Sequence, residues 1–275
     1  MTDDKHTYLP AGFHQVDEVD DPDVYSSCLK LLDTLPHFAT YKHNSYELLE
    51  LASGDKVLDA GCGLGVDVLR MAQAVGPTGL VLGVDSSEHL LSLARAEREN
   101  TSSSAHFLLC DLSGLPLADA SFQKVRVDRV LQHVARPAAA LSEMVRVLAT
   151  KGRLYAYDND WHTFNIVPQH REVTALLEAY WRDSFVNSDI GCVLEPMFLD
   201  AGLSEVKVQP LTYTLSEFAV ADQVFNLSKT AHLACRDGLI SEEGCQRWLD
   251  DLHHSDRRGE FRARLTAYAV IGTKR

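Results

Sequence analysis

The chain has 275 residues and a mass of 30.5 kDa, with 45% hydrophobic and 24% charged residues. This is ordinary globular composition, which excludes disorder of the whole chain. The 26 Lys and Arg residues against 39 Asp and Glu give a formal net charge of −13. Such an acidic protein lacks the positive surface that a general nucleic-acid binder needs to displace counterions. We therefore expect no nucleic-acid partner.

A membrane or secretory role is not indicated either. The sequence contains no run of about 18 uncharged apolar residues, and no polybasic segment for an anionic membrane. Its first residues, MTDDKHTYLPAGF, are polar and acidic, unlike a signal peptide. The six cysteines are scattered without a Cys-x-x-Cys pair, which favours neither a zinc cage nor a disulfide framework. We expect a cytoplasmic protein without stable membrane insertion.

The N-terminal fifth of the chain predicts a polar tail followed by helices. Residues 1–20 are rich in Asp, Thr, Gly and Pro, whereas residues 22–51 carry apolar side chains at helical spacing. Pro36 interrupts this pattern and predicts two helices, the second over residues 38–51.

The next hundred residues alternate between strand and helix patterns. Five strands are predicted, at 56–60, 80–84, 106–110, 124–128 and 153–157. Helices are predicted between them, at 66–75, 87–100 and 138–148. Such alternation is typical of a parallel sheet covered on both faces, in a doubly wound α/β fold.

The pattern changes after Trp161. Helices are predicted over 172–185 and from 194, and a further helical segment over about 216–256. Two strands are predicted at 205–215 and 264–271, and they suit an antiparallel edge of the same sheet. We expect residues 1–53 to form a tail and lid helices. Residues 54–275 would then form one domain with a seven-stranded, mostly parallel sheet, and 216–256 would be a helical insert.

A glycine-rich loop follows the first strand. Val57-Leu58-Asp59-Ala60 leads into Gly61, Cys62, Gly63, Leu64 and Gly65, directly before a helix. Glycines let a backbone approach a ligand closely, and a helix N-terminus favours polar groups. A plain strand-to-helix turn would look the same, so this motif alone is weak.

Acidic residues at successive strand ends strengthen the reading of a ligand site. Asp85 ends the second strand, 20 residues after Gly65, where doubly wound folds bind ribose hydroxyls. Asp111 follows the third strand. Helix capping explains one such residue easily but explains Asp59, Asp85 and Asp111 together less well, because ligands in these folds bind at the carboxyl ends of strands.

These motifs resemble those of class I S-adenosylmethionine-dependent methyltransferases. Residues 57–65 match the family's first motif, residues 122–128 match its fourth-strand motif, and residues 129–134 (RVLQHV) resemble the extension found in small-molecule methyltransferases. The similarity covers residues 55–160 strongly and is closest to the quinone-biosynthesis and natural-product group. A nicotinamide dehydrogenase more often has Gly-x-Gly-x-x-Gly, whereas this loop reads Gly-x-Gly-x-Gly.

The resemblance implies a Rossmann-like methyltransferase fold that binds S-adenosyl-L-methionine and releases S-adenosyl-L-homocysteine. It assigns ribose binding to Asp85 and adenine contacts to Asp111 and Leu112. It assigns the amino-acid end of the donor to Asp59 and the loop. The residues expected to bind the cofactor are Tyr41, Asp59, Gly61, Cys62, Gly63, Gly65, Asp85, Ser86, Asp111, Leu112, Asp128 and Arg129.

His133 is the candidate general base, because it follows the fourth strand, where acceptors approach the methyl group in this family. The alternative is that His133 only packs against the donor or orients a backbone group. A second polar and aromatic cluster ends the fifth strand. Its residues Asp158, Asp160, Trp161 and His162 are expected to line the acceptor site, although a loop with an Asn/Asp turn and one buried aromatic residue explains the cluster somewhat better. Phe218, in the segment 216–256, is a further expected acceptor contact, but its apolar spacing is equally that of a core helix.

A small-molecule acceptor is expected, either a secondary metabolite or a quinone precursor. A regulatory protein that binds the donor with little catalysis, and a protein or peptide methyltransferase, remain alternatives. No metal site is predicted, because the histidines form no His-x-x-x-His pair. The oligomeric state stays open, and a homodimer is compatible with the sequence.

Overall fold

A seven-stranded sheet forms the centre of the protein. The structure is a computed structural model that describes residues 8–99, 104–167 and 171–275. The first seven residues of the expected tail, and Asn100 at the end of an expected helix, lie outside the described residues. The strands are β1 (Lys56–Ala60), β2 (Leu80–Asp85), β3 (Ala105–Leu109), β4 (Phe122–Asp128), β5 (Leu148–Ile166), β6 (Leu203–Leu215) and β7 (Ala263–Lys274).

The strand order is β3-β2-β1-β4-β5-β7-β6. β1 to β5 are parallel, and β7 runs antiparallel to both β5 and β6. The expected doubly wound, mostly parallel sheet with an antiparallel edge is therefore confirmed. Ala60 pairs with Val84 of β2 and with Val127 of β4. This register brings the residues that follow β1, β2 and β4 to one edge of the sheet, as parallel pairing requires.

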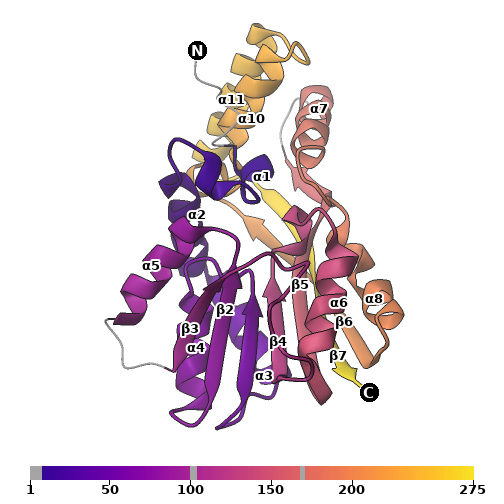
Figure 1. The fold of residues 1–275 in the computed structure, drawn as a ribbon. Coiled ribbons are helices and arrows are strands. Elements are labelled where there is room, and N and C mark those ends of the chain that lie inside the picture. Colours follow the sequence, from indigo (N-terminus) through magenta and orange to yellow (C-terminus); the bar gives the residue numbers. More distant parts are fainter. Residues whose placement is uncertain (1–7, 100–103, 168–170) are drawn as a thin grey trace.

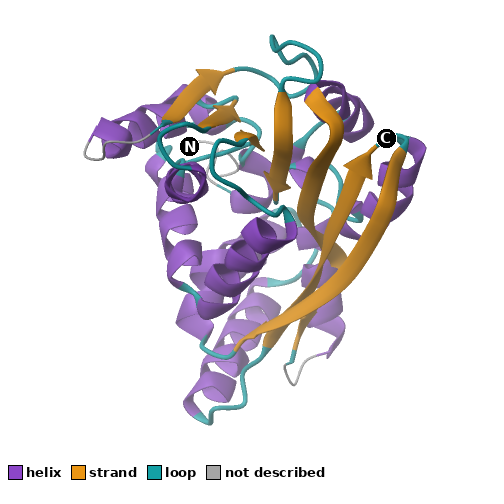
Figure 2. Ribbon diagram, turned by 90° about the horizontal axis from the view of Figure 1, so that it is seen from below, coloured by secondary structure: helices purple, strands orange, loops and turns teal. Residues whose placement is uncertain are grey.

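Helices cover both faces of the sheet (Figure 2). They are α1 (Leu9–Gly12), α2 (Asp23–Thr34), α3 (Pro36–Leu48), α4 (Val66–Val75), α5 (Glu88–Glu99), α6 (Pro137–Val147), α7 (Arg171–Arg182), α8 (Ile190–Asp200), α9 (Phe218–Phe225), α10 (Leu227–Arg236) and α11 (Glu242–Arg257). Short 3-10 turns, η1 (Val16–Glu18) and η2 (Leu131–His133), join them. Pro36 separates the two expected helices by standing at the first turn of α3, where its missing N–H leaves no bond unmade.

One end of the molecule is built from segments far apart in sequence. α1, α7, α10 and α11 gather beyond the end of the sheet that is opposite to the C-terminus (Figure 1). Their buried aromatic and aliphatic side chains form one cluster with the N-terminal helices and the far halves of β5, β6 and β7. Between β6 and β7, where the sequence predicts a helical segment, the chain forms α9, α10 and α11.

The N-terminal segment is joined to the sheet domain by Asp17. Its carboxylate accepts hydrogen bonds from Ser87 Oγ at 2.5 Å and from the backbone N–H groups of Glu88 and His89 at 2.7 and 3.2 Å. Those N–H groups belong to the first turn of α5, whose amide donors have no partners within the helix. Asp17 therefore supplies a helix cap from a distant part of the chain.

β5 is longer than the sequence indicates, because it pairs with β7 as far as Ile166 opposite Ala263. The hydrophobic pattern of its second half is interrupted by polar residues, so local sequence suggests a loop there. No helix in the described part of the chain is long and apolar enough to cross a bilayer.

Candidate functional site

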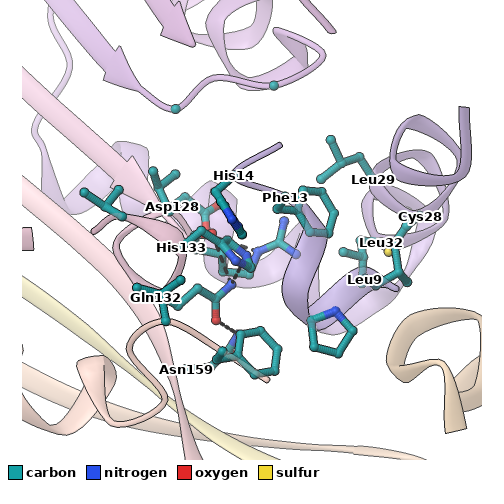
Figure 3. Close-up of a pocket in the computed structure, with 18 of the residues that line it drawn as sticks. Leu9, Phe13, His14, Cys28, Leu29, Leu32, Asp128, Gln132, His133 and Asn159 are labelled. Carbon is teal, nitrogen blue, oxygen red and sulfur yellow. Dashed lines mark hydrogen bonds and ion pairs between the residues drawn. The ribbon is translucent and has the colours of Figure 1, made fainter. Parts of the chain in front are cut away.

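A cavity of about 500 Å³ opens at the carboxyl edge of the parallel strands. One part of its wall comes from the glycine loop and the strand ends, namely Gly61, Gly63, Asp85, Ser86, Cys110, Asp111, Leu112, Asp128, Arg129 and Val130. The other part is largely apolar and comes from the covering helices and β5, with Leu9, Phe13, Leu29, Leu32, Phe38, Trp161, Trp181, Phe185, Tyr213 and Phe225. Its size suits a small-molecule site. Figure 3 shows how α1 and α2 bring side chains over the strand ends.

The glycine loop takes a compact, left-handed course. Gly61, Gly63 and Gly65 have φ values of 75°, 51° and 68°, which favour glycine. A Cβ atom on Gly61 would lie 2.3 Å from Val130 Cγ2, and one on Gly65 would lie 2.6 Å from the Phe107 ring. Gly61 and Gly63 line the cavity, whereas Gly65 serves the packing of α4 against its neighbours.

The loop holds its shape through its own N–H groups. Gly61 and Cys62 both donate to the Val84 carbonyl oxygen, at 2.8 and 2.9 Å. Gly63 donates to Asp85 Oδ2 at 2.7 Å. The N–H groups of Gly61, Cys62 and Gly63 are therefore not free to donate to a ligand. Because they are bonded within the protein, they give the loop a fixed surface that a ligand can approach closely.

Asp85 stands at the centre of the strand ends. Burial raises the pKa of its carboxyl, although the N–H groups of Gly63 and Ser87 favour the ionised form. Asp111 is exposed at the rim, where hydrogen bonds from Ser113 lower the pKa of its carboxyl. Ser86 and Leu112 line the same part of the cavity. The structure thus brings the expected ribose-side and adenine-side residues into one cavity.

Asp59 has a different neighbour from the one expected. It is buried and accepts a hydrogen bond from Arg126 Nη1 at 3.1 Å. Arg126, itself only 1% exposed, also lies 3.5 Å from Asp67 and 2.7 Å from Asp128. Asp59 and Cys62 line a second cavity of about 60 Å³ beside the main one, so Asp59 reaches ligand space only there. Its main role in the structure is to neutralise a buried arginine that the sequence analysis did not single out.

Tyr41 supports this network instead of lining either cavity. Its hydroxyl donates to Asp128 Oδ1 at 3.0 Å, and its ring stacks on Tyr157 with centroids 3.8 Å apart. Asp128 and Arg129 line both cavities. Burial would lower the pKa of the Arg129 guanidinium, but Tyr41, Asp128 and other neighbours raise it, so Arg129 is a permanent cation at the boundary between the two spaces.

His133 lines the main cavity at the end of η2. Burial, with smaller contributions from His14 and Arg129, lowers the pKa of its imidazole to about 3. The ring is therefore neutral at neutral pH. Its Nε2 lies 3.1 Å from Gln132 Nε2, whereas its buried Nδ1 has no hydrogen-bond partner among the described residues.

The second expected cluster divides between the two faces of β5. Trp161 lines the cavity, and so does Asn159, which lies two residues before it on the same face of the strand. Asp158 and Asp160 are buried away from it: Asp158 accepts from the N–H groups of Gln132 and Asn159, and Asp160 accepts from His162 N. Side chains on a strand alternate between faces, which separates the two pairs.

His162 and Phe218 are also corrected. His162 is exposed outside the cavity. Phe218 is 5% exposed and packs on His253 and Phe261 at ring distances of 4.5 and 5.7 Å. Its helical spacing is that of a core residue, and the neighbouring aromatic residue of α9, Phe225, lines the cavity instead.

Several lining residues were missed by the sequence analysis. They are Leu9, Phe13, His14, Cys28, Leu29 and Leu32 from the N-terminal segment, Trp181 in the last turn of α7, and Phe185 and Val186 after that helix. For Phe13, the only local feature of the sequence that could have indicated a role in the site is an aromatic residue within a polar N-terminal segment. Gln132 stood in a quoted motif without a role, and it contacts His133, Asn159 and Trp161.

The strand order, the glycine loop and the acidic strand ends together define the Rossmann-like class of S-adenosylmethionine-dependent methyltransferases. A family model described as "Methyltransferase domain" matches residues 51–196. An uncharacterized 37.1 kDa protein in transposon TN4556 of Streptomyces fradiae is 38% identical over 246 residues, which cover 89% of this chain and 70% of that protein.

Two further comparisons agree with this class. A demethylmenaquinone methyltransferase of Lactococcus lactis is 31% identical over 122 residues, 44% of this chain and 48% of the relative, so the match spans about half of that enzyme's length. The solved structure of the YcgJ protein from Bacillus subtilis shares the fold, with a TM-score of 0.58, 19% identity and coverage of 85% of this chain and 97% of that one. The chain belongs to the methyltransferase domain family, and it is an S-adenosylmethionine-dependent methyltransferase.

Proposed function

We propose that this enzyme methylates an apolar small molecule, bound in the cavity between the strand ends and the covering helices. The observation that carries this proposal is the continuity of one cavity from the glycine loop and Asp85 to a wall of aromatic side chains that includes Phe13, Trp161 and Phe185. A donor at the polar end and an acceptor at the aromatic end would meet inside this one cavity.

The residues of the polar end fit S-adenosyl-L-methionine. Asp85 offers carboxyl oxygens for ribose hydroxyls, and Asp111 and Leu112 offer a polar group and an apolar surface for adenine. Gly63, with its left-handed backbone and no side chain, leaves a surface on which the donor can lie. The adjoining small cavity, with Asp59, Asp128 and Arg129, has both charge signs needed for a zwitterionic amino-acid end.

When bound, the donor supplies an electrophilic methyl group on a positively charged sulfur. Transfer by in-line displacement demands alignment of the acceptor and exclusion of water more than it demands side-chain chemistry. The covering helices and Asp17, which fixes their N-terminal segment to α5, are suited to both tasks. His133 is the proposed catalytic residue, because its ring lines the cavity next to Phe13 and Phe185.

The apolar lining favours a hydrophobic metabolite over a basic peptide, whose charges would lose their water there. A quinone precursor or a secondary metabolite has this character. The partial match to a demethylmenaquinone methyltransferase supports the quinone-like alternative without covering the whole of that enzyme.

The acceptor can be sought directly. The purified protein is incubated with a small-molecule extract and S-adenosylmethionine carrying an isotopically labelled methyl group, and products are read by mass spectrometry. We expect a labelled apolar product that is absent with boiled protein. Label appearing only in added protein or peptide would refute the proposal, and donor binding without any product would favour the regulatory alternative.

The donor site has its own test. Asp85→Ala and Gly63→Val are expected to abolish binding of S-adenosylmethionine in calorimetry, because the first removes the ribose acceptor and the second places a branched side chain on the loop surface at a φ of 51°. Asp200→Ala, at an exposed position in the last turn of α8, is the control and should bind normally. Unchanged affinity in both site variants would refute the assignment.

A further inference from the structure

The Gln132 side chain has a fixed orientation. Its Oε1 accepts a hydrogen bond from the Trp161 indole N–H at 2.8 Å, and its Nε2 donates to the Arg129 carbonyl oxygen at 3.1 Å. An indole N–H can only donate and a carbonyl oxygen can only accept. Exchanging the amide oxygen and nitrogen would break both bonds, so the amide group cannot turn over. Figure 3 shows Gln132 between His133 and Asn159.

This orientation determines which nitrogen of His133 carries the proton. Gln132 Nε2 has two hydrogens; one meets the Arg129 carbonyl, and the other meets His133 Nε2 at 3.1 Å. His133 Nε2 must therefore accept. A neutral imidazole has a single N–H, so in His133 the proton is on Nδ1.

The Nδ1–H group is a buried donor without an acceptor in the described part of the chain. The rings of Phe13 and Phe185, with centroids 5.2 and 5.7 Å from that of His133, present no hydrogen-bonding oxygen. The titratable neighbours that act on His133 are His14 and Arg129, and neither forms a hydrogen bond with His133 Nδ1. An unsatisfied buried donor costs about 1–3 kcal/mol, and a ligand oxygen in the cavity would remove this cost.

We propose that His133 donates a hydrogen bond from Nδ1–H to a carbonyl oxygen of the methyl acceptor and does not act as a general base through that atom. The inference rests on the proposed function, because it concerns the molecule that the aromatic part of the cavity receives. It narrows the acceptor to apolar compounds with a ketone-type or quinone-type oxygen. In this role Gln132 and Trp161 are positioning residues, since they act only by fixing the tautomer of His133.

The tautomer is measurable without any substrate. In protein with ¹⁵N-labelled histidine, long-range ¹H–¹⁵N correlation spectra distinguish the two nitrogens of a neutral ring. We expect His133 to be protonated on Nδ1 in the wild-type protein. In Gln132→Glu, a carboxylate that only accepts faces Nε2, and the proton is expected to move there. A wild-type His133 protonated on Nε2, or a tautomer that does not respond to Gln132→Glu, would overturn the inference.

The hydrogen bond itself is tested with two probes of the same shape. 1-Tetralone has one ketone oxygen, and tetralin has the same ring skeleton without it. A hydrogen bond to a buried donor is expected to make the wild-type protein bind 1-tetralone about tenfold more tightly than tetralin. The difference in hydration between the two probes is the same for every variant, so comparing the affinity ratios of the variants removes it. His133→Phe and His133→Ala should lose this preference.

His133→Asn is the matched variant, because its amide N–H₂ can take the position of the imidazole Nδ1–H and donate into the cavity. We expect it to retain most of the preference for 1-tetralone. If Asn loses as much as Ala, or if Ala retains the preference, the donor role is refuted. Failure to find any methylated small molecule would refute the proposed function instead, and the tautomer of His133 would still be decided by the spectra.

Discussion

Replacing Arg126 by methionine tests the buried charge network under the site. Arg126 Nη1 lies 3.1 Å from Asp59 Oδ1 and 3.5 Å from Asp67 Oδ2, and Nη2 lies 2.7 Å from Asp128 Oδ2. Its Nε also donates to Ser45 Oγ at 3.0 Å. Methionine fills much of the same volume without charge, so the variant removes the cation and leaves the carboxylates.

The loss is unequal among the three carboxylates. Asp67 keeps Lys42 at 2.8 Å, and Asp128 keeps the Tyr41 hydroxyl at 3.0 Å. Asp59 loses the cation that lowers the pKa of its buried carboxyl. Breaking a buried pair by removing one partner typically costs about 3–5 kcal/mol, and we expect Arg126→Met to lose that much free energy of unfolding.

The effect should depend on pH in a defined direction. Burial already raises the pKa of Asp59 to about 6 with Arg126 in place, and without Arg126 this pKa is expected to rise further above its value in the unfolded chain. The folded variant then binds more protons, so its stability falls as pH rises through that window. Urea unfolding at pH 5 and pH 8 should therefore show a larger deficit at pH 8.

The control is Arg95→Met, which removes an arginine from the exposed pair Arg95–Glu88 in α5. Methionine and arginine have similar helix propensity, and an exposed ion pair contributes about 0–1 kcal/mol. A loss below about 1 kcal/mol in Arg126→Met, no greater than in this control, would refute the reasoning.

Two further predictions concern stability. Burial raises the pKa of Asp158 to about 7, so the folded protein binds an extra proton between pH of about 4 and 7, and stability is lost as pH rises. Asp158→Asn should remove up to about 4 kcal/mol of this pH-dependent change in the free energy of unfolding, measured by denaturant titration at several pH values. A variant with the same pH dependence as the wild-type protein would contradict the prediction. Asp17→Ala should cost about 1 kcal/mol by uncapping α5, and it should speed hydrogen exchange in residues 88–91 while exchange in α11 is unaffected.

Much of the fold follows from local pattern. The helix over Val66–Val75 and the strand over Lys56–Ala60 lie where the sequence predicts them, because period and turn residues agree there. Asp85, Asp111 and Asp128 reach one cavity because parallel strands end at a common edge. These features follow from the alternation of strands and helices and from their order along the chain, and both can be read from the sequence.

Three-dimensional packing decided the acceptor side. The sequence does not distinguish Asp158 and Asp160 from their neighbours Asn159 and Trp161. Because side chains alternate between the two faces of β5, only Asn159 and Trp161 reach the cavity. The wall formed by Phe13, Leu29 and Phe185 joins segments that no local pattern relates.

The sequence by itself determined that this protein has a doubly wound methyltransferase fold, and it located the glycine loop and the acidic strand ends at which we propose that the donor binds. Only the tertiary structure decided the state of His133. Its proton position depends on Gln132, the orientation of Gln132 depends on Trp161, and these groups come together through the docking of η2 against β5. Hydrogen-bond direction is a property of neighbours in space, so residue types and spacing cannot specify it.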